Sequence, residues 1–180
     1  MKNLFKIKVS NVKLSLKLKD LVINTDENAH LDFFEKYNRI IKVENFTITI
    51  YHNNPHALHM TGIKNLCENL DLAIKTISLL SSVNFNYIKS IIRIDNITAT
   101  CNYYKSKVNL IILFKKIKAK NDVHVRFNPV KFPGMTVKFS SKSGTAIIFE
   151  SGKINLLGCK NIPSINRLII CTLDLINQNN

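Results

Sequence analysis

Cysteine and histidine side chains are the groups in this sequence that could ligate a metal or act as nucleophile and base. The four cysteines stand far apart, with no Cys-x-x-Cys pair and no histidine cluster beside them: Cys67, Cys101, Cys159 and Cys171. Zinc sites take their ligands in close pairs, so no metal is expected, and free buried thiols are the simpler expectation. The five histidines lack triad spacing, and the carboxylates form no acid–base pair. We therefore expect no catalytic constellation, no cofactor and no small-molecule substrate.

The charge balance is strongly basic. Lysine and arginine number 26 against 12 aspartates and glutamates, a formal net charge of +14 in 180 residues. This excess favours a polyanionic partner such as nucleic acid, or an anionic membrane surface, over the alternative of a merely solvated lysine-rich surface. The N-terminus alternates lysine with apolar residues, which is typical of neither a signal peptide nor a membrane span. We expect a soluble intracellular protein with no membrane partner.

Hydrophobic periodicity predicts the elements that would position functional side chains. Period-two alternation predicts strands over residues 12–19, 46–51, 57–61, 90–101, 135–139, 145–149 and 154–158. Apolar residues at three- and four-residue steps predict amphipathic helices over residues 66–80 and 162–176. Residues 109–116 fit either a helix or a further strand.

The two halves of the chain repeat one order of elements. Phe34 to Tyr51 spans 17 positions, and so does Phe132 to Phe149. Each pair is followed by a hairpin, a Gly-x-Lys tripeptide and an amphipathic helix. A period of about 90 residues indicates a duplicated unit, because solenoid repeats are much shorter.

Two segments of the second half resemble the second repeat of TATA-binding proteins: Phe127-Asn128-Pro129-Val130-Lys131-Phe132-Pro133-Gly134, and the run from Ala146 to Lys160. The resemblance reaches back to the strand Asn96–Cys101, whereas the first half matches weakly. It implies an α+β fold in which two repeats, residues 1–85 and 86–180, form a pseudo-two-fold saddle. A continuous curved antiparallel sheet would carry helices on its convex face and lay its concave face on a widened minor groove, bending the DNA.

The resemblance also implies roles for individual side chains. The wedges that enter between base steps would be Phe132, Phe149, Phe34 and Tyr51. The groove contacts would be Asn11, Asn96, Thr98, Thr61, Thr145 and Ile147. The phosphate contacts would be Lys64, Lys138, Lys153 and Lys160.

Strand parity agrees with these roles. Asn96 and Thr98 share one face of their strand, while Ile97 and Ala99 share the other, which would pack on helices. The same alternation runs through residues 11–16. Polar residues of the first half and second half would therefore line one surface.

Three positions depart from the family pattern. Leu157 stands at a threonine position, Asn155 at that of a groove-facing valine, and Tyr51 at that of a phenylalanine. These departures leave open whether a strict TATA preference is kept.

Taken together, these features predict a non-enzymatic, DNA-binding transcription initiation factor. It would bind and bend A·T-rich promoter DNA and, by resemblance, recruit a B-type initiation factor and RNA polymerase, in the nucleus or in a cytoplasmic viral factory. The alternative is a saddle-shaped interaction platform that has lost direct DNA binding. A third possibility is the substrate-binding domain of a nucleic-acid enzyme.

Overall fold

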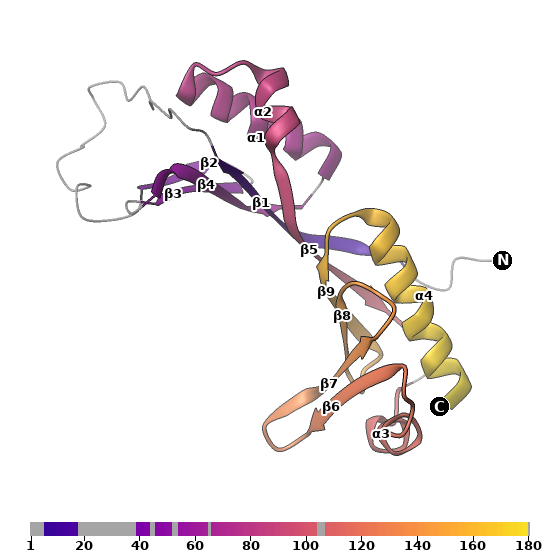
Figure 1. Cartoon of the computed structure of the whole chain (residues 1–180). Coiled ribbons are helices and arrows are strands. Elements are labelled where there is room, and N and C mark those ends of the chain that lie inside the picture. Colours follow the sequence, from indigo (N-terminus) through magenta and orange to yellow (C-terminus); the bar gives the residue numbers. More distant parts are fainter. Residues whose placement is uncertain are drawn as a thin grey trace. The chain divides into compact units, whose positions relative to one another are not determined.

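The chain forms two compact units. The computed structural model describes residues 6–17, 39–43, 46–51, 54–64, 66–103 and 107–179. The first unit is Asn11–Asp95, and the second unit is Asn96–Asn180 together with Met1–Ser10 (Figure 1). Phe34 lies outside the described residues, so its predicted role as a wedge stays a prediction.

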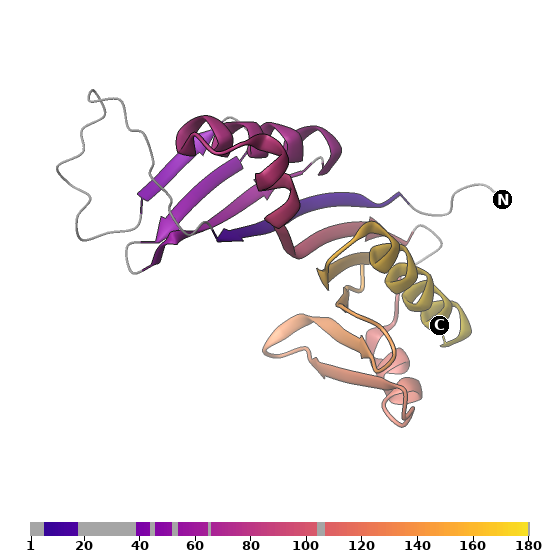
Figure 2. The same ribbon diagram turned by 45° about the horizontal axis from the view of Figure 1, so that its top comes forward.

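The first unit is a sheet covered by helices on one face. Its strands, in hydrogen-bonded order β2-β3-β4-β1, are β2 (Arg39–Val43), β3 (Phe46–Tyr51), β4 (Asn54–Ile63) and β1 (Lys8–Lys17). The helices α1 (Leu66–Ser81) and α2 (Phe85–Ile91) lie across these strands (Figure 2).

The second unit repeats this plan with additions. Its strands, in the order β5-β9-β8-β7-β6, are β5 (Arg93–Asn102), β9 (Lys153–Cys159), β8 (Thr145–Ile148), β7 (Phe132–Phe139) and β6 (Val123–Asn128). Helix α4 (Ile162–Asn179) packs on β8 and β9, and α3 (Leu110–Ile117) contacts β6 and α4 (Figure 1).

The internal repeat is visible in the strand order. The arrangement β2-β3-β4-β1 with α1 recurs as β7-β8-β9-β5 with α4. β1 and β5 each contribute residues to both units. The predicted α+β class, with an antiparallel sheet and a repeat, is confirmed.

The predicted alternation also holds, because β1 and β5 have the same burial pattern along ten residues. Three alternate side chains of each strand lie in the core: Val12, Leu14 and Leu16 of β1, and Ile97, Ala99 and Cys101 of β5. Burying one such aliphatic side chain stabilises the fold by about 1.5–3 kcal/mol, which fixes the strand register.

Two boundaries differ from the pattern-based expectation. The strand expected from residue 90 begins only at Arg93, because Asn84 caps α2 and the helix runs to Ile91. The ambiguous segment 109–116 is helix α3: the Asn109 side chain accepts a hydrogen bond from the Ile112 N–H, and every third or fourth apolar residue is buried. β2, β6 and α2 were not predicted.

Two of the thiols are free and buried as expected, Cys101 and Cys159, while Cys171 is partly exposed. Burial raises the pKa of Cys101 to about 11 and also raises that of Cys159. The side chain of Cys67 lies outside the described part of the chain. None of the described helices is long and apolar enough to cross a membrane.

Candidate nucleic-acid interface

Each unit has a sheet face opposite its helices, called here the open face. On the first unit this face holds the alternate residues that pair across β2, β3, β4 and β1: Ile40, Lys42, Thr47, Thr49, Tyr51, His59, Thr61, Asn11, Lys13 and Ser15. On the second unit it holds Asn96, Thr98, Thr100, Lys153, Asn155, Leu157, Thr145, Ile147, Thr136, Lys138, Arg126 and His124. The predicted groove residues thus lie on these faces, together with several that were not predicted.

The two predicted asparagines make the same contact, one in each unit. The side-chain oxygen of Asn96 accepts a hydrogen bond of 2.7 Å from the backbone N–H of Gly158. The side-chain oxygen of Asn11 likewise accepts one of 2.7 Å from Gly62. Both glycines have left-handed φ angles, 78° and 93°, a conformation that other residues adopt only with strain.

This contact decides what each asparagine can offer a ligand. The amide oxygen already accepts a hydrogen bond, so the amide NH₂, a donor, is the group available to a partner. One N–H of Asn96 also donates to the Thr98 hydroxyl, at 3.4 Å, which leaves its second N–H. In the minor groove, A·T and T·A pairs present only acceptors, namely adenine N3 and thymine O2. An amide N–H of Asn11 or Asn96 is thus the kind of donor that such acceptors require.

The two predicted wedges of the second unit lie together. The rings of Phe132 and Phe149 meet edge to face, with centroids 5.9 Å apart and planes at 68°. Phe132 is 45% exposed and Phe149 is partly exposed, so neither is a core residue. Both rings and the Ile147 methyl close over Gly134, where an added Cβ would lie only 2.6, 3.0 and 2.7 Å from them. An apolar cluster is thus presented to solvent over a position that admits only glycine without rearrangement.

The wedge position of the first unit is different. Tyr51 is on the open face, but its hydroxyl lies 2.9 Å from Nδ1 of His59, and the two rings meet edge to face at 4.9 Å. Burial, followed by the nearby Lys13, lowers the pKa of His59, while Asp95 opposes that shift. His59 was missed by the sequence reading, although it has the strand parity of Thr61, which was chosen.

The four predicted phosphate-binding lysines are all exposed: Lys64, Lys138, Lys153 and Lys160. Among the described residues the one ion pair is Lys89–Asp71, so none of these four amines is paired with a carboxylate there. Lys138 pairs across the strands with His124, next to Arg126, and all three line a hollow that also includes Lys118 and Lys120. The spacing of these basic residues in the sequence does not predict that they cluster on β6, β7 and the turn after α3.

Further polar groups lie on or beside the open faces, so these faces are not purely apolar. The Asp95 carboxylate accepts a hydrogen bond of 2.8 Å from the Ser15 hydroxyl. The side-chain oxygen of Asn155 is buried without a hydrogen-bond partner in the described part of the chain. Asn155 occupies one of the positions that depart from the family pattern.

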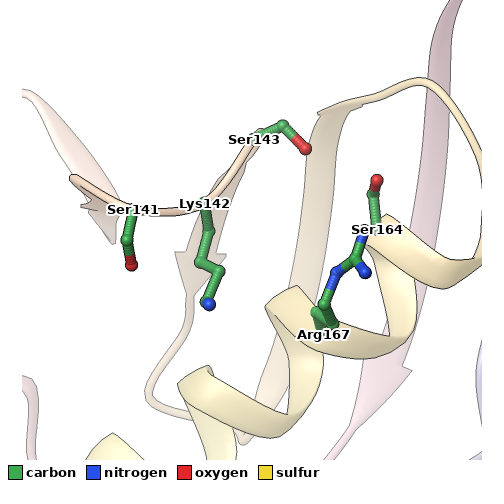
Figure 3. A pocket seen from close by; sticks show the side chains of 5 residues that line it. All are labelled: Ser141, Lys142, Ser143, Ser164 and Arg167. Carbon is green, nitrogen blue, oxygen red and sulfur yellow. The ribbon is translucent and has the colours of Figure 1, made fainter.

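A second hollow opens away from this face, beside α4. Ser141, Lys142 and Ser143 of the β7–β8 turn line it together with Ser164 and Arg167 of the helix (Figure 3). The Ser164 hydroxyl and backbone N–H both donate hydrogen bonds to the side-chain oxygen of Asn161, which caps the helix. We assign this hollow no part in the interface.

The family match lies almost entirely in the second unit. Residues 91–178 match the family described as transcription factor TFIID, or TATA-binding protein. The TATA-box-binding protein of Methanothermobacter thermautotrophicus is 33% identical over 85 residues, 47% of this chain and 44% of that protein. TATA-box-binding protein-like 1 of Entamoeba histolytica is 28% identical over 132 residues, 71% of this chain and 57% of that protein. The matched part of the chain thus spans only about half the length of these relatives.

The solved structure of Methanococcus jannaschii TBP has the same fold. It superposes with a TM-score of 0.68 over 97% of this chain and 99% of that one, at 21% sequence identity. Residues 91–178 thus match the TATA-binding protein family by sequence, and almost the whole chain has the fold of this solved structure.

Proposed function

We propose that this protein is a non-enzymatic transcription initiation factor that binds A·T-rich promoter DNA through the minor groove and bends it. The observation that carries the proposal is the pair of asparagines on the open faces. In both units a glycine N–H donates to the amide oxygen at 2.7 Å, and although one N–H of Asn96 also donates to the Thr98 hydroxyl at 3.4 Å, the other is left to donate to a ligand. Minor-groove edges of A·T pairs offer the matching acceptors.

The wedge cluster supports bending in particular. An exposed Phe132 ring edge-on to Phe149 is an apolar group without a protein partner on its outer side. Inserting such rings between base steps removes their apolar surface from water, and this offsets the few kcal/mol needed to unstack a step. In this proposal the second unit supplies the principal kink.

The basic side chains supply affinity that does not depend on sequence. Lys138, Lys153 and Arg126 lie on or at the end of the open face, and no carboxylate neutralises them within the described residues. Each phosphate neutralised releases counterions, so binding is expected to weaken steeply with salt. Lys64 and Lys160 end the two Gly-x-Lys tripeptides and would contact phosphates in the same way.

The remaining parts of the proposal rest on the family. Residues 1–85 and 86–180 would be its two repeats, with Phe34 as the second wedge of the first. A B-type initiation factor and RNA polymerase would be the protein partners, in the nucleus or in a cytoplasmic viral factory.

A titration of labelled duplexes tests the proposal. Anisotropy measured with an A·T-rich duplex and a G·C-rich duplex of equal length, across a salt series, should give tighter binding to the first. Energy transfer between dyes at the two ends of the A·T-rich duplex should rise when the protein binds, as the ends approach. Equal affinity for both duplexes, or binding without a change in energy transfer, would contradict the proposal.

A second function has one specific observation in its favour. The Asp95 carboxylate adjoins the open face of the first unit, where a negative charge disfavours DNA. An interaction platform that no longer binds DNA would tolerate that charge. The same titration separates the two, since a platform would bind neither duplex at physiological salt.

A further inference from the structure

The pair formed by Tyr51 and His59 gives the first unit a group that the second unit lacks. His59 pairs across the strands with Thr49 on one side and Ser15 on the other, which places it inside the open face. The Tyr51 oxygen lies 2.9 Å from His59 Nδ1, and the ring planes meet at 77°. The imidazole is therefore held by both a hydrogen bond and a ring contact.

The hydrogen bond fixes which ring nitrogen carries the proton. A phenol is a stronger donor than a neutral imidazole N–H, so the Tyr51 hydroxyl donates and Nδ1 accepts. The proton of the neutral ring then resides on Nε2. Among the described residues, Nε2 has no hydrogen-bond partner. His59 thus holds an N–H donor that the protein itself does not use.

The corresponding position of the second unit carries a different side chain. His59 and Asn155 each lie three residues before the glycine that binds an asparagine, Gly62 and Gly158. Asn155 pairs with Ile147, as His59 pairs with Thr49. No aromatic hydroxyl fixes the Asn155 amide, because the neighbouring wedges are phenylalanines. The two half-sites are therefore read by different chemistry.

We propose that His59 is a specificity-determining residue: its Nε2–H, positioned by Tyr51, donates to the minor-groove acceptor of an A·T pair and rejects guanine. The inference rests on the proposed binding of DNA. Guanine differs from the other bases in the minor groove by its 2-amino group, the one base donor there. Facing that group with a fixed N–H leaves two donors unpaired in a desolvated site, which costs affinity.

Inosine provides the decisive probe, since an inosine·cytosine pair is a G·C pair without the 2-amino group. Single A·T pairs of one A·T-rich duplex are replaced in turn by G·C or by inosine·cytosine, and each affinity is measured by anisotropy. At the position facing His59, the wild type should bind the inosine duplex nearly as well as the parent and the G·C duplex about tenfold more weakly. His59→Val should reduce that ratio to near one at this position alone.

Two further variants keep the test sharp. Tyr51→Phe removes only the hydroxyl, frees the imidazole to place its proton on either nitrogen, and should also reduce the ratio. Asn155→Val is the matched control and should leave the ratio at this position unchanged. Thermal unfolding of every variant checks the fold; if His59→Val does not fold, Tyr51→Phe decides.

The outcomes separate this inference from the proposed function. A wild type that binds no duplex would refute the proposed function, and the role of His59 with it. Binding with an unchanged guanine penalty in both His59→Val and Tyr51→Phe would overturn the inference alone. A wild type that binds the G·C duplex more tightly than the inosine duplex would also overturn it, because Nε2 would then be an acceptor.

Discussion

Asn96 and Gly158 are 62 positions apart in the sequence and are joined by a hydrogen bond of 2.7 Å between the side-chain oxygen and the backbone N–H. Asn11 and Gly62 repeat this bond at the same length in the other unit. In the proposed interface the two ends of the Asn96 amide have different tasks: the oxygen accepts from β9, and the N–H that does not donate to Thr98 would bind the ligand. The two tasks can be separated by mutation.

Asn96→Asp should retain the fold and lose DNA affinity. The carboxylate still accepts from the Gly158 N–H, but it cannot donate, and its charge repels the phosphates. We expect a loss of about 1–3 kcal/mol in binding free energy on an A·T-rich duplex, with little change in the urea midpoint of unfolding. Asn86→Asp, on the exposed side of α2, makes the same change of charge away from the open face and should bind nearly as wild type. Equal losses in both variants would assign the effect to net charge alone.

Replacing Phe132 and Phe149 together by alanine should reduce bending more than stability. Phe132 is 45% exposed, so its truncation leaves no buried cavity of the kind that costs a core phenylalanine about 3–5 kcal/mol. Phe139→Ala is the core comparison, because that ring is only 8% exposed on the opposite face of the same strand. End-to-end energy transfer on a labelled duplex measures bending, and urea unfolding measures stability. A folded double variant that bends DNA like the wild type would remove the wedge role.

The strands with strong hydrophobic alternation could be predicted, because the alternation is a local feature of the sequence. In β1 and β5, parity alone separates the core residues from those of the open face, because side chains alternate between the two faces of a strand. Helix α3 could not be chosen over a strand from its short apolar run. Its helical conformation is stabilised by the Asn109 cap and by packing on β6 and α4. The packing depends on the tertiary structure, which a short apolar run does not reveal.

The candidate site could be predicted only where residues matched a known pattern. Asn96, Phe132 and Phe149 lie within such a stretch, and the structure places them on the open face or exposed beside it. His59 and Arg126 belong to no motif that the sequence shows. Each is placed by a residue of another strand: Tyr51 of β3 contacts His59, and Thr136 of β7 pairs with Arg126. The bond of Asn96 to Gly158 depends on the pairing of β5 with β9, which no spacing within the sequence specifies.

Single substitutions of the exposed lysines should reveal phosphate contacts by salt dependence. Lys138→Ala or Lys153→Ala should weaken binding to every duplex alike and lower the slope of log affinity against log salt by about one. Lys75→Ala, on the exposed side of α1, removes the same charge from the helix layer and should leave the slope unchanged. A selective loss of A·T preference with an unaltered slope would place the lysine against a base edge instead.

The stability of the protein should fall in acid through His59. Burial and Lys13 lower the pKa of His59 below the ordinary value of 6.5, so below pH 6.5 the unfolded chain binds a proton that the folded chain does not. Stability rises with pH wherever the unfolded state holds more protons; this contribution is complete above pH 6.5 and is lost as pH falls toward the folded pKa. His59→Gln should flatten that part of the curve of unfolding free energy against pH. An unchanged curve in His59→Gln would show that His59 titrates alike in both states.

Gly134→Ala tests whether the wedge cluster needs its geometry or only its rings. An added Cβ would lie 2.6 Å from the Phe132 ring and 2.7 Å from the Ile147 methyl, both nearer than real contacts allow, and 3.0 Å from the Phe149 ring, which is tight. These neighbours are side chains, and Phe132 is free to move outward because it is exposed. We therefore expect the rings to separate while the strand β7 keeps its place, at a cost in stability near the lower end of the 1–3 kcal/mol typical of overpacking.

The consequence of Gly134→Ala for DNA should be larger than its consequence for the fold. Rings pushed apart no longer enter one base step together, so energy transfer across the labelled duplex should fall toward that of the Phe132→Ala, Phe149→Ala double variant. Affinity at low salt should fall less, because the lysines proposed to contact phosphates are untouched. Gly152→Ala is the contrasting variant: that glycine has a φ of 83° in the turn between β8 and β9, so its substitution strains the backbone and should lower stability instead. Full bending by Gly134→Ala, with the rings displaced, would mean that an apolar surface is sufficient and that the edge-to-face arrangement of Phe132 and Phe149 has no part in kinking the duplex.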